Sequence, residues 1–263
     1  MRRLNALWRY RGFVFSMVGR EFRIRYLGSL FGSIWSILNP MAMIFVYTII
    51  FSKIMRARLS GVDDTMAYGV FLCAGLLTWG FFSELLSRCQ NIFIEQSHLL
   101  KKVRFPRITL PVILLFSSAL NFFIIFAIFI IFLLITNRIP GWSILGFIPL
   151  LLIQQGFALG FGIFLGTLNV FFRDIGHFIG IILTFWFWLT PIVYPITILS
   201  DKSRNLIQFN PMTQIIMAYQ EIVLYNRWPH WEQFVYHIIG ASIALTAGSI
   251  IFIKLSGEIV DEL

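Results

Sequence analysis

The run from residue 108 to residue 136, ITLPVILLFSSALNFFIIFAIFIIFLLIT, contains 29 consecutive residues without a charged side chain. An α-helix needs about 20 residues to cross a hydrocarbon core of about 30 Å. The apolar residues of this run do not alternate with polar ones, as they would in a strand of a membrane barrel. The run therefore predicts a membrane-spanning helix, and this restricts the chain to folds that exist in a bilayer.

The rest of the sequence has the same character. Of its 263 residues, 58% are hydrophobic and 13% are charged, which is more apolar surface than a soluble domain of this length buries. We therefore expect an all-α membrane protein, with residues 1–263 forming one domain of six transmembrane helices. The predicted spans are residues 31–51, 66–87, 108–136, 143–172, 175–196 and 233–255.

The N-terminal segment, residues 1–30, carries seven arginines among apolar residues. Seven of these apolar residues fall near one helical face: Leu4, Leu7, Trp8, Val14, Phe15, Val18 and Phe22. This pattern predicts an amphipathic helix in the membrane interface. The alternative is a basic tail that only sets orientation. We expect no cleaved signal peptide, because charges interrupt the apolar run and no small-residue cleavage site follows it.

The distribution of Lys and Arg predicts the orientation. With the N-terminus inside, 14 of the 21 basic residues lie on the inner side and seven on the outer side. The positive-inside rule then places both termini and residues 88–107 in the cytoplasm, and residues 191–231 outside. We expect residues 197–231 to fold back onto the membrane surface as short helices, because they are too long and apolar for a plain turn. The net charge of +9 reflects this anchoring and anionic lipid rather than nucleic acid.

Small residues predict close helix packing. Two overlapping pairs with the spacing small-xxx-small, Gly156 with Gly160 and Gly162 with Gly166, would let helix backbones approach closely. Cys73 and Cys89 lie 16 residues apart on one predicted helix, so they cannot pair with each other within one chain. We therefore expect no disulfide framework and no cysteine metal site.

Signals for catalysis are weak. The sequence has no G-x-x-x-x-G-K-[ST] motif for ATP and no H-E-x-x-H spacing, so we expect no metal, no cofactor and no ATP site in this chain. Charges are missing from the middle of most spans, which argues against an ion-driven carrier. Asp63-Asp64 would suit a lipid-sugar glycosyltransferase, but a solvated turn is the stronger interpretation, because six spans with short loops leave little room for a catalytic domain. Uphill transport would need a partner to supply the energy.

Five short motifs occur in order along the chain. They are Arg20-Glu21-Phe22 with Arg25-Tyr26 and the stretch to Asn39-Pro40, Lys101-Lys102-Val103 to Phe105-Pro106-Arg107, Phe171-Phe172-Arg173-Asp174, Pro191-Ile192-Val193-Tyr194-Pro195, and Asn210-Pro211. With them the sequence resembles the permease subunits of ABC-2 type exporters, and among these the O-antigen polysaccharide permeases of the Wzm type. The resemblance covers nearly the whole chain.

The resemblance implies a transport subunit of the bacterial inner membrane. It implies a homodimer joined to two cytoplasmic ATPase subunits, which bind the ATP and Mg, and a substrate that is a long glycan on undecaprenyl diphosphate. Capsule or teichoic acid export is the alternative within this class. Residues 88–107 would couple to the ATPase and residues 197–231 would form an outward gate. The implied coupling residues are Glu95, His98, Lys101, Lys102, Arg104, Phe105, Pro106 and Arg107, and the implied gate residues are Pro191, Pro195, Asn210 and Pro211.

Residue chemistry adds expectations for these regions. Pro106 would end a helix abruptly before the next span, and Phe105 would fill a pocket on the partner. Arg173-Asp174 is expected to form an ion pair that shapes a turn. The guanidinium groups of Arg20, Arg23 and Arg25 suit a lipid diphosphate, with ordinary anionic lipid as the alternative. Aromatic rings suit a sliding glycan, or else a membrane-interface belt: the candidates are Trp35, Tyr47, Phe185, Trp186, Trp188 and Tyr194.

Overall fold

The computed structural model describes residues 10–26, 34–50, 66–102 and 105–262. All regular structure in these ranges is helical, which confirms the predicted all-α class. The longer helices are α2 (Arg11–Tyr26), α3 (Trp35–Ile49), α4 (Ala67–Glu95), α6 (Thr109–Ile135), α7 (Phe147–Phe171), α8 (Asp174–Leu189), α10 (Pro211–Tyr225) and α11 (Val235–Leu255). The shorter ones are α5 (Ser97–Lys102), η3 (Trp142–Gly146), η4 (Ile196–Ile198), α9 (Asp201–Gln208), η5 (Trp231–Phe234) and α12 (Glu258–Glu262).

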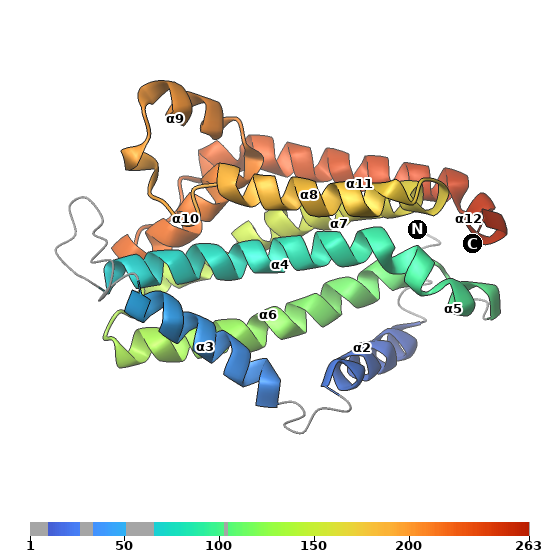
Figure 1. The fold of residues 1–263 in the computed structure, drawn as a ribbon, viewed down its shortest axis with the longest axis horizontal. Coiled ribbons are helices and arrows are strands. Elements are labelled where there is room, and N and C mark those ends of the chain that lie inside the picture. Colours follow the sequence, from blue (N-terminus) through green and yellow to red (C-terminus); the bar gives the residue numbers. More distant parts are fainter. Residues whose placement is uncertain (1–9, 27–33, 51–65, 103–104, 263) are drawn as a thin grey trace.

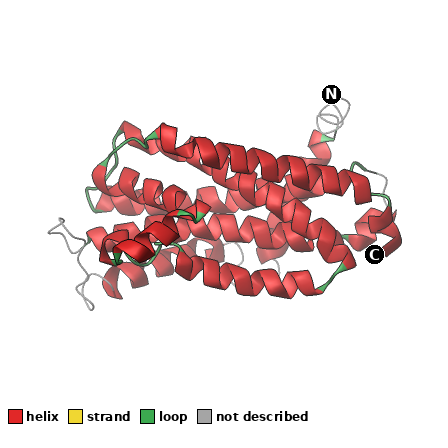
Figure 2. Cartoon of the chain, turned by 90° about the horizontal axis from the view of Figure 1, so that it is seen from above, coloured by secondary structure: helices red, strands yellow, loops and turns green. Residues whose placement is uncertain are grey.

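Helices α4, α6, α7, α8 and α11 lie roughly along one axis of the molecule, and α2, α3 and α10 are inclined to it (Figures 1 and 2). Helix α4 runs through the middle and contacts α3, α6, α7, α8 and α10. Most of its residues are buried, from Ala67 at one end to Phe93 near the other. Helices α5 and α12 lie at one end of the bundle and α9 at the opposite end (Figure 1). The two ends of the bundle therefore carry different elements, joined by α4.

Four helical segments are long and apolar enough to cross a membrane. They are Ala67–Glu95, Thr109–Ile135, Trp142–Phe171 and Trp231–Leu255. Helices α3 and α8, at the other two predicted spans, have 15 and 16 residues. The chain thus has the helices of a multi-pass membrane protein, and the count of six stays a prediction. Helix α4 continues past the predicted limit at residue 87 into the segment expected to be cytoplasmic.

The glycine pairs of α7 serve two different neighbours. A Cβ atom on Gly160 would lie 2.3 Å from the backbone nitrogen of Leu245 in α11, and one on Gly166 would lie 2.4 Å from the carbonyl oxygen of Cys89 in α4. On α11, a Cβ on Gly248 would lie 2.2 Å from the carbonyl oxygen of Gly160. These distances are too short for any side chain, so the predicted close approach of helix backbones is confirmed.

Both cysteines are buried free thiols on α4. Helix α2 packs on α6 through Val14, Met17 and Val18, which contact Ile113. Phe15, expected on the same apolar face, is instead 66% exposed. Residues 1–9, which carry the first part of that predicted face, lie outside the described part of the chain.

Candidate functional site

The predicted coupling residues lie at one end of the bundle, around α5. Glu95 ends α4, and His98, Lys101 and Lys102 are exposed on α5. Leu100 of the same helix is buried and joins the main apolar core. Helix α5 also contacts the C-terminal helix α12. It is therefore a short, positively charged projection fixed to the bundle by its apolar side. Arg104 lies outside the described residues.

Phe105 and Pro106 make contacts within the chain. The Phe105 ring is half-buried, with its centroid 5.5 Å from that of Phe13 in α2. The Pro106 carbonyl accepts hydrogen bonds from the backbone N–H and the hydroxyl of Thr109, at 2.9 and 2.8 Å. Pro106 thus stands just before the beginning of α6. Arg107, also half-buried, accepts a bond from Leu110 N–H at its carbonyl.

A cluster of charged side chains joins α2, α4 and α6. The Arg88 guanidinium donates to the Glu21 carboxylate at 2.6 Å and lies 3.6 Å from Glu84. The Asn121 amide donates to Glu84 at 3.0 Å, and Arg88 donates to Ser118 at 3.3 Å. All three charged side chains are 18–27% exposed. In such a setting each charge depends on its partners, because water screens it only in part. We call Glu21, Glu84, Arg88 and Asn121 the charge cluster.

Sequence reasoning named Glu21 only as part of a motif and assigned no role to Arg88. Glu84 and Arg88 stand four residues apart on one predicted helix, a spacing that brings opposite charges together. That signal could have identified half of the charge cluster. The contribution of Glu21 could not be found this way, because it depends on the packing of α2 against α6.

The turn between α7 and α8 is held by amides. Asn169 accepts a hydrogen bond from Gly176 N–H at 2.9 Å and donates to the Gln90 carbonyl at 3.0 Å. Gln90 in turn donates to the Gly176 carbonyl at 3.2 Å. The expected ion pair between Arg173 and Asp174 is wrong: both side chains are exposed, and they form no ion pair in the described structure. The buried amides of Asn169 and Gln90 hold this turn instead, because it packs against α4.

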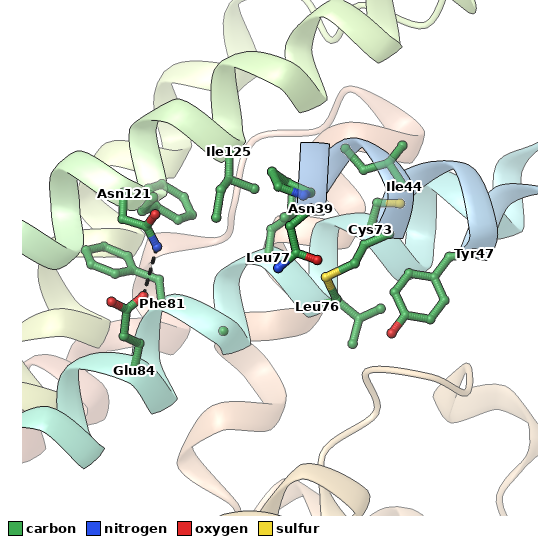
Figure 3. A pocket seen from close by; sticks show the side chains of 14 residues that line it. Asn39, Ile44, Tyr47, Cys73, Leu76, Leu77, Phe81, Glu84, Asn121 and Ile125 are labelled. Carbon is green, nitrogen blue, oxygen red and sulfur yellow. Dashed lines mark hydrogen bonds between the residues drawn. The ribbon is translucent and has the colours of Figure 1, made fainter. Parts of the chain in front are cut away.

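A cavity of about 180 Å³ opens between α3, α4 and α6 (Figure 3). Its walls are mostly apolar, with Ile44, Cys73 and Leu77 among them. Figure 3 shows Tyr47 toward one end and the Glu84–Asn121 hydrogen bond at the other. The charge cluster therefore borders a cavity that α3 closes on one side. Among the proposed channel aromatics, Tyr47 lines this cavity; Trp35, at the beginning of α3, is 46% exposed.

The aromatic residues at the end of α8 point in different directions. Phe185 and Trp188 are 66% and 60% exposed. Trp186 is half-buried, and its ring meets Phe82 of α4 edge to face at 5.5 Å. Its indole N–H donates to the Asn210 side chain at 2.8 Å. Phe185 and Trp188 are thus free to meet a ligand or lipid, whereas Trp186 fixes α8 to the rest of the chain.

Asn210, one of the predicted gate residues, bonds to the end of α8 and to the beginning of α10. Its side-chain oxygen also accepts from Met212 N–H at 3.0 Å and so caps α10, in which Pro211 is the first residue. Tyr194 donates its hydroxyl hydrogen to the Trp188 carbonyl at 2.9 Å. Asparagine before proline at a helix start satisfies an orphan backbone donor. These bonds join the end of α8 to the beginning of α10.

The turn after α8 is bound to α4 and α10. The Tyr68 hydroxyl donates to the Val193 carbonyl at 2.6 Å. The Gln220 amide donates to the Pro191 carbonyl at 3.2 Å. Pro191 is buried and Pro195 half-buried. Side chains from two helices, α4 and α10, therefore hold the turn after α8 in place.

We expect Trp186→Phe to lower the stability of the protein by about 1 kcal/mol, the usual net value of one hydrogen bond. The ring contacts remain, but Asn210 loses the indole donor. Thermal unfolding of the purified protein in detergent measures the effect. Trp188→Phe is the matched control, because its exposed indole N–H makes no hydrogen bond within the described residues. Equal melting temperatures for the two variants would contradict the prediction.

The remaining predicted sites are only partly described. Arg20 and Arg23 are exposed on α2, and the side chain of Arg25 lies outside the described part of the chain. The Asp63-Asp64 pair, on which a glycosyltransferase would depend, also falls outside it. Among the described residues, no three His, Cys, Asp or Glu side chains gather as metal ligands. The described charged residues among the predicted sites thus lie at the α5 end and on α2.

Comparison with known proteins agrees with the predicted resemblance. Residues 13–224, from α2 to near the end of α10, match the family model of ABC-2 type transporters. The chain is 32% identical to the O-antigen export system permease protein RfbA of Myxococcus xanthus, over 96% of this chain and 95% of that protein. Two proteins of the same name from Klebsiella pneumoniae are 30% identical over 93% of both chains, and 29% identical over 81% of this chain and 82% of that one. The chain therefore belongs to the ABC-2 type transporter family.

Proposed function

We propose that this chain is the membrane-spanning permease subunit of an ATP-driven exporter of O-antigen. The observation that carries the proposal is the match to an O-antigen export permease over 96% of the chain. The sequence has no ATP-binding motif of its own, so the energy would come from a partner ATPase. In the proposed complex two copies of the chain join two ATPase subunits, and the substrate is a glycan on undecaprenyl diphosphate.

The arrangement of charge supports an orientation for this complex. Helix α5 carries exposed Lys101 and Lys102 at one end of the bundle, beside α12 (Figure 1). Helices α9 and α10 lie toward the opposite end. We therefore assign α5 to the cytoplasmic ATPase contact, residues 197–231 to the outer gate, and both termini to the cytoplasm. With α3 and α8 counted as spans, the chain crosses the inner membrane six times.

The exposed side chains of α8 and α2 support two further assignments of substrate contacts. Phe185 and Trp188 on α8 are open to a passing glycan, and sugar C–H faces stack well on such rings. Arg20 and Arg23 are exposed on α2, where they can bind the diphosphate of a lipid carrier. Each contact is weak by itself, which suits a polymer that must slide.

Deletion of the gene that encodes this chain tests the proposed export function. We expect lipopolysaccharide to lose its O-antigen and lipid-linked polymer to accumulate on the cytoplasmic side of the inner membrane. A plasmid copy of the chain restores surface O-antigen. Purification of the chain should also recover an ATPase whose activity depends on it. Normal surface O-antigen in the deletion strain would overturn the proposal.

The coupling assignment predicts the behaviour of a double variant, Phe105→Ala with Pro106→Ala. These changes remove the ring contact with Phe13 and free the beginning of α6 from its fixed proline. We expect export to fall about tenfold, within the range of ordinary coupling free energies of about 1–3 kcal/mol, while ATP hydrolysis by the complex continues. The measurement is the ratio of exported polymer to ATP hydrolysed.

Phe116→Ala is the matched control for that experiment. Phe116 makes a comparable ring contact between α6 and α2, at 6.4 Å from Phe15, but lies outside residues 88–107. We expect its ratio of export to hydrolysis to stay at the wild-type level. An unchanged ratio in the double variant, with the complex intact, would sink the coupling assignment.

A further inference from the structure

A second cavity lies between α7, α10, α11 and the end of α9, away from the cavity of Figure 3. Its volume is about 440 Å³, within the range of about 300–1,000 Å³ usual for small-molecule sites. None of the channel aromatics proposed above lines it. Eleven residues do so: Ile153, Phe157, Gln208, Phe209, Pro211, Met212, Gln214, Ile215, Tyr236, His237 and Gly240. We call it the outer cavity, because α9 and the beginning of α10 lie on the proposed external side.

The lining of the outer cavity combines rings with uncharged polar groups. Phe209 and Tyr236 are 86% and 82% exposed, unusually open for aromatic residues, and stand where the cavity meets the surface. Gln208 and Gln214 add amides, and His237 adds an imidazole. An acyl chain cannot form hydrogen bonds with these polar groups. A saccharide uses both kinds, since its C–H face stacks on a ring and its hydroxyls bond to amides.

Two polar atoms of the lining, Gln214 Oε1 and His237 Nδ1, are buried and have no hydrogen-bond partner among the described residues. A buried acceptor left in this state costs about 1–3 kcal/mol. A ligand hydroxyl is a donor that would relieve this cost. The observation therefore favours a hydroxyl-bearing ligand over a hydrocarbon one.

The charge of the lining side chains restricts the chemical class of the ligand further. The eleven described residues of the lining include no Lys, Arg, Asp or Glu. A phosphate or diphosphate group would find no cation there, and a basic ligand would find no carboxylate. The chemistry thus fits an uncharged stretch of sugar and not the head group of a lipid carrier.

We propose that the outer cavity is a saccharide-binding subsite, which holds an uncharged sugar segment of the exported polymer on the external side. This inference rests on the proposed export function and adds a site outside the transport channel. A weak site at the exit would hinder the emerging polymer from sliding back. Tyr236 and Phe209 would stack on the sugar, and Gln214 would accept a hydroxyl hydrogen.

Binding to the purified full-length chain in lipid nanodiscs tests the subsite without any transport. The probe is a set of short oligosaccharides cut from the host's own O-antigen after mild acid has removed its lipid. Saturation-transfer NMR should detect binding. We expect Tyr236→Leu and Gln214→Leu each to raise the dissociation constant about threefold to tenfold, because each variant loses one stacking or hydrogen-bonding contact.

Trp228→Leu is the matched control, because Trp228 is a half-exposed aromatic that follows α10 but does not line the cavity. Tyr236→Leu keeps the test decisive even if Gln214→Leu fails to fold, since Tyr236 is almost fully exposed. Oligosaccharide binding that is equally strong in Tyr236→Leu and wild type would overturn the subsite.

A second arm separates sugar from lipid. Undecaprenyl diphosphate without sugar, added to the same nanodiscs, should not displace the oligosaccharide. Displacement that disappears in Tyr236→Leu would identify a lipid site and overturn the inference. Neither outcome depends on export, so the subsite can fail while the deletion strain still establishes the transport function.

Discussion

Gly160→Ala should destabilise the protein strongly, whereas Gly156→Ala, one helical turn away on α7, should be nearly neutral. The added Cβ at residue 160 would lie 2.3 Å from the backbone nitrogen of Leu245, which cannot move without the whole of α11. At residue 156 the nearest atom is a side-chain methyl of Leu245 at 3.5 Å, an ordinary contact. Both variants gain the same helix propensity, so the difference between them isolates the helix contact.

We expect Gly160→Ala to cost about 3 kcal/mol, the upper part of the usual range for overpacking. Loss of the contact between α7 and α11 would also lower the amount of protein that reaches the membrane. The measurement is thermal unfolding in detergent, with membrane yield as a second readout. A Gly160→Ala protein as stable as Gly156→Ala would show that α11 is not held against α7 in this way.

Arg88→Met is the second substitution with a large expected effect. It removes the cation that faces both Glu21 and Glu84 and keeps a side chain of similar length. Breaking a buried ion pair by removing one partner costs about 3–5 kcal/mol. Because these groups are about a fifth to a quarter exposed, we expect a smaller loss of about 2–3 kcal/mol, or a fall in melting temperature of about 5–10 °C.

A second change should partly rescue that variant. Glu21→Gln in the Arg88→Met background removes the carboxylate that lost its 2.6 Å bond to Arg88, so stability should rise again. Arg173→Met is the control, since the Arg173 side chain is exposed and forms no ion pair in the described residues. A rescue of zero would mean that Arg88 contributes by packing alone and that its charge is unimportant.

The elements that the sequence predicts well are those fixed by composition along a single helix. Uncharged runs predicted the long helices, and the spacing of the glycines, including Gly160 and Gly166, predicted the close helix contacts. Both signals are local in the sequence. The resemblance identified the family from five short motifs. These features need no knowledge of which helix lies beside which.

Features that depend on direction were harder to predict. The contact of Phe105 with Phe13 was not predicted, because apolar character alone does not say which surface covers a ring. Its fit to a pocket on the partner stays a prediction. Phe185, Trp186 and Trp188 looked alike in the sequence. A helix turns about 100° per residue, so Trp186 faces inward while the other two face out. Only tertiary packing separates these roles.

Helix α4 has a consequence for how the two ends of the molecule communicate. Its 29 residues make a rod about 43 Å long, at 1.5 Å per residue. At one end it leads through Glu95 into α5, and near the other Tyr68 bonds to the Val193 carbonyl. A displacement of α5 would move this rod as one piece and so act directly on the turn after α8. One rigid helix would therefore transmit a displacement from one end of the molecule to the other, without a series of separate conformational changes.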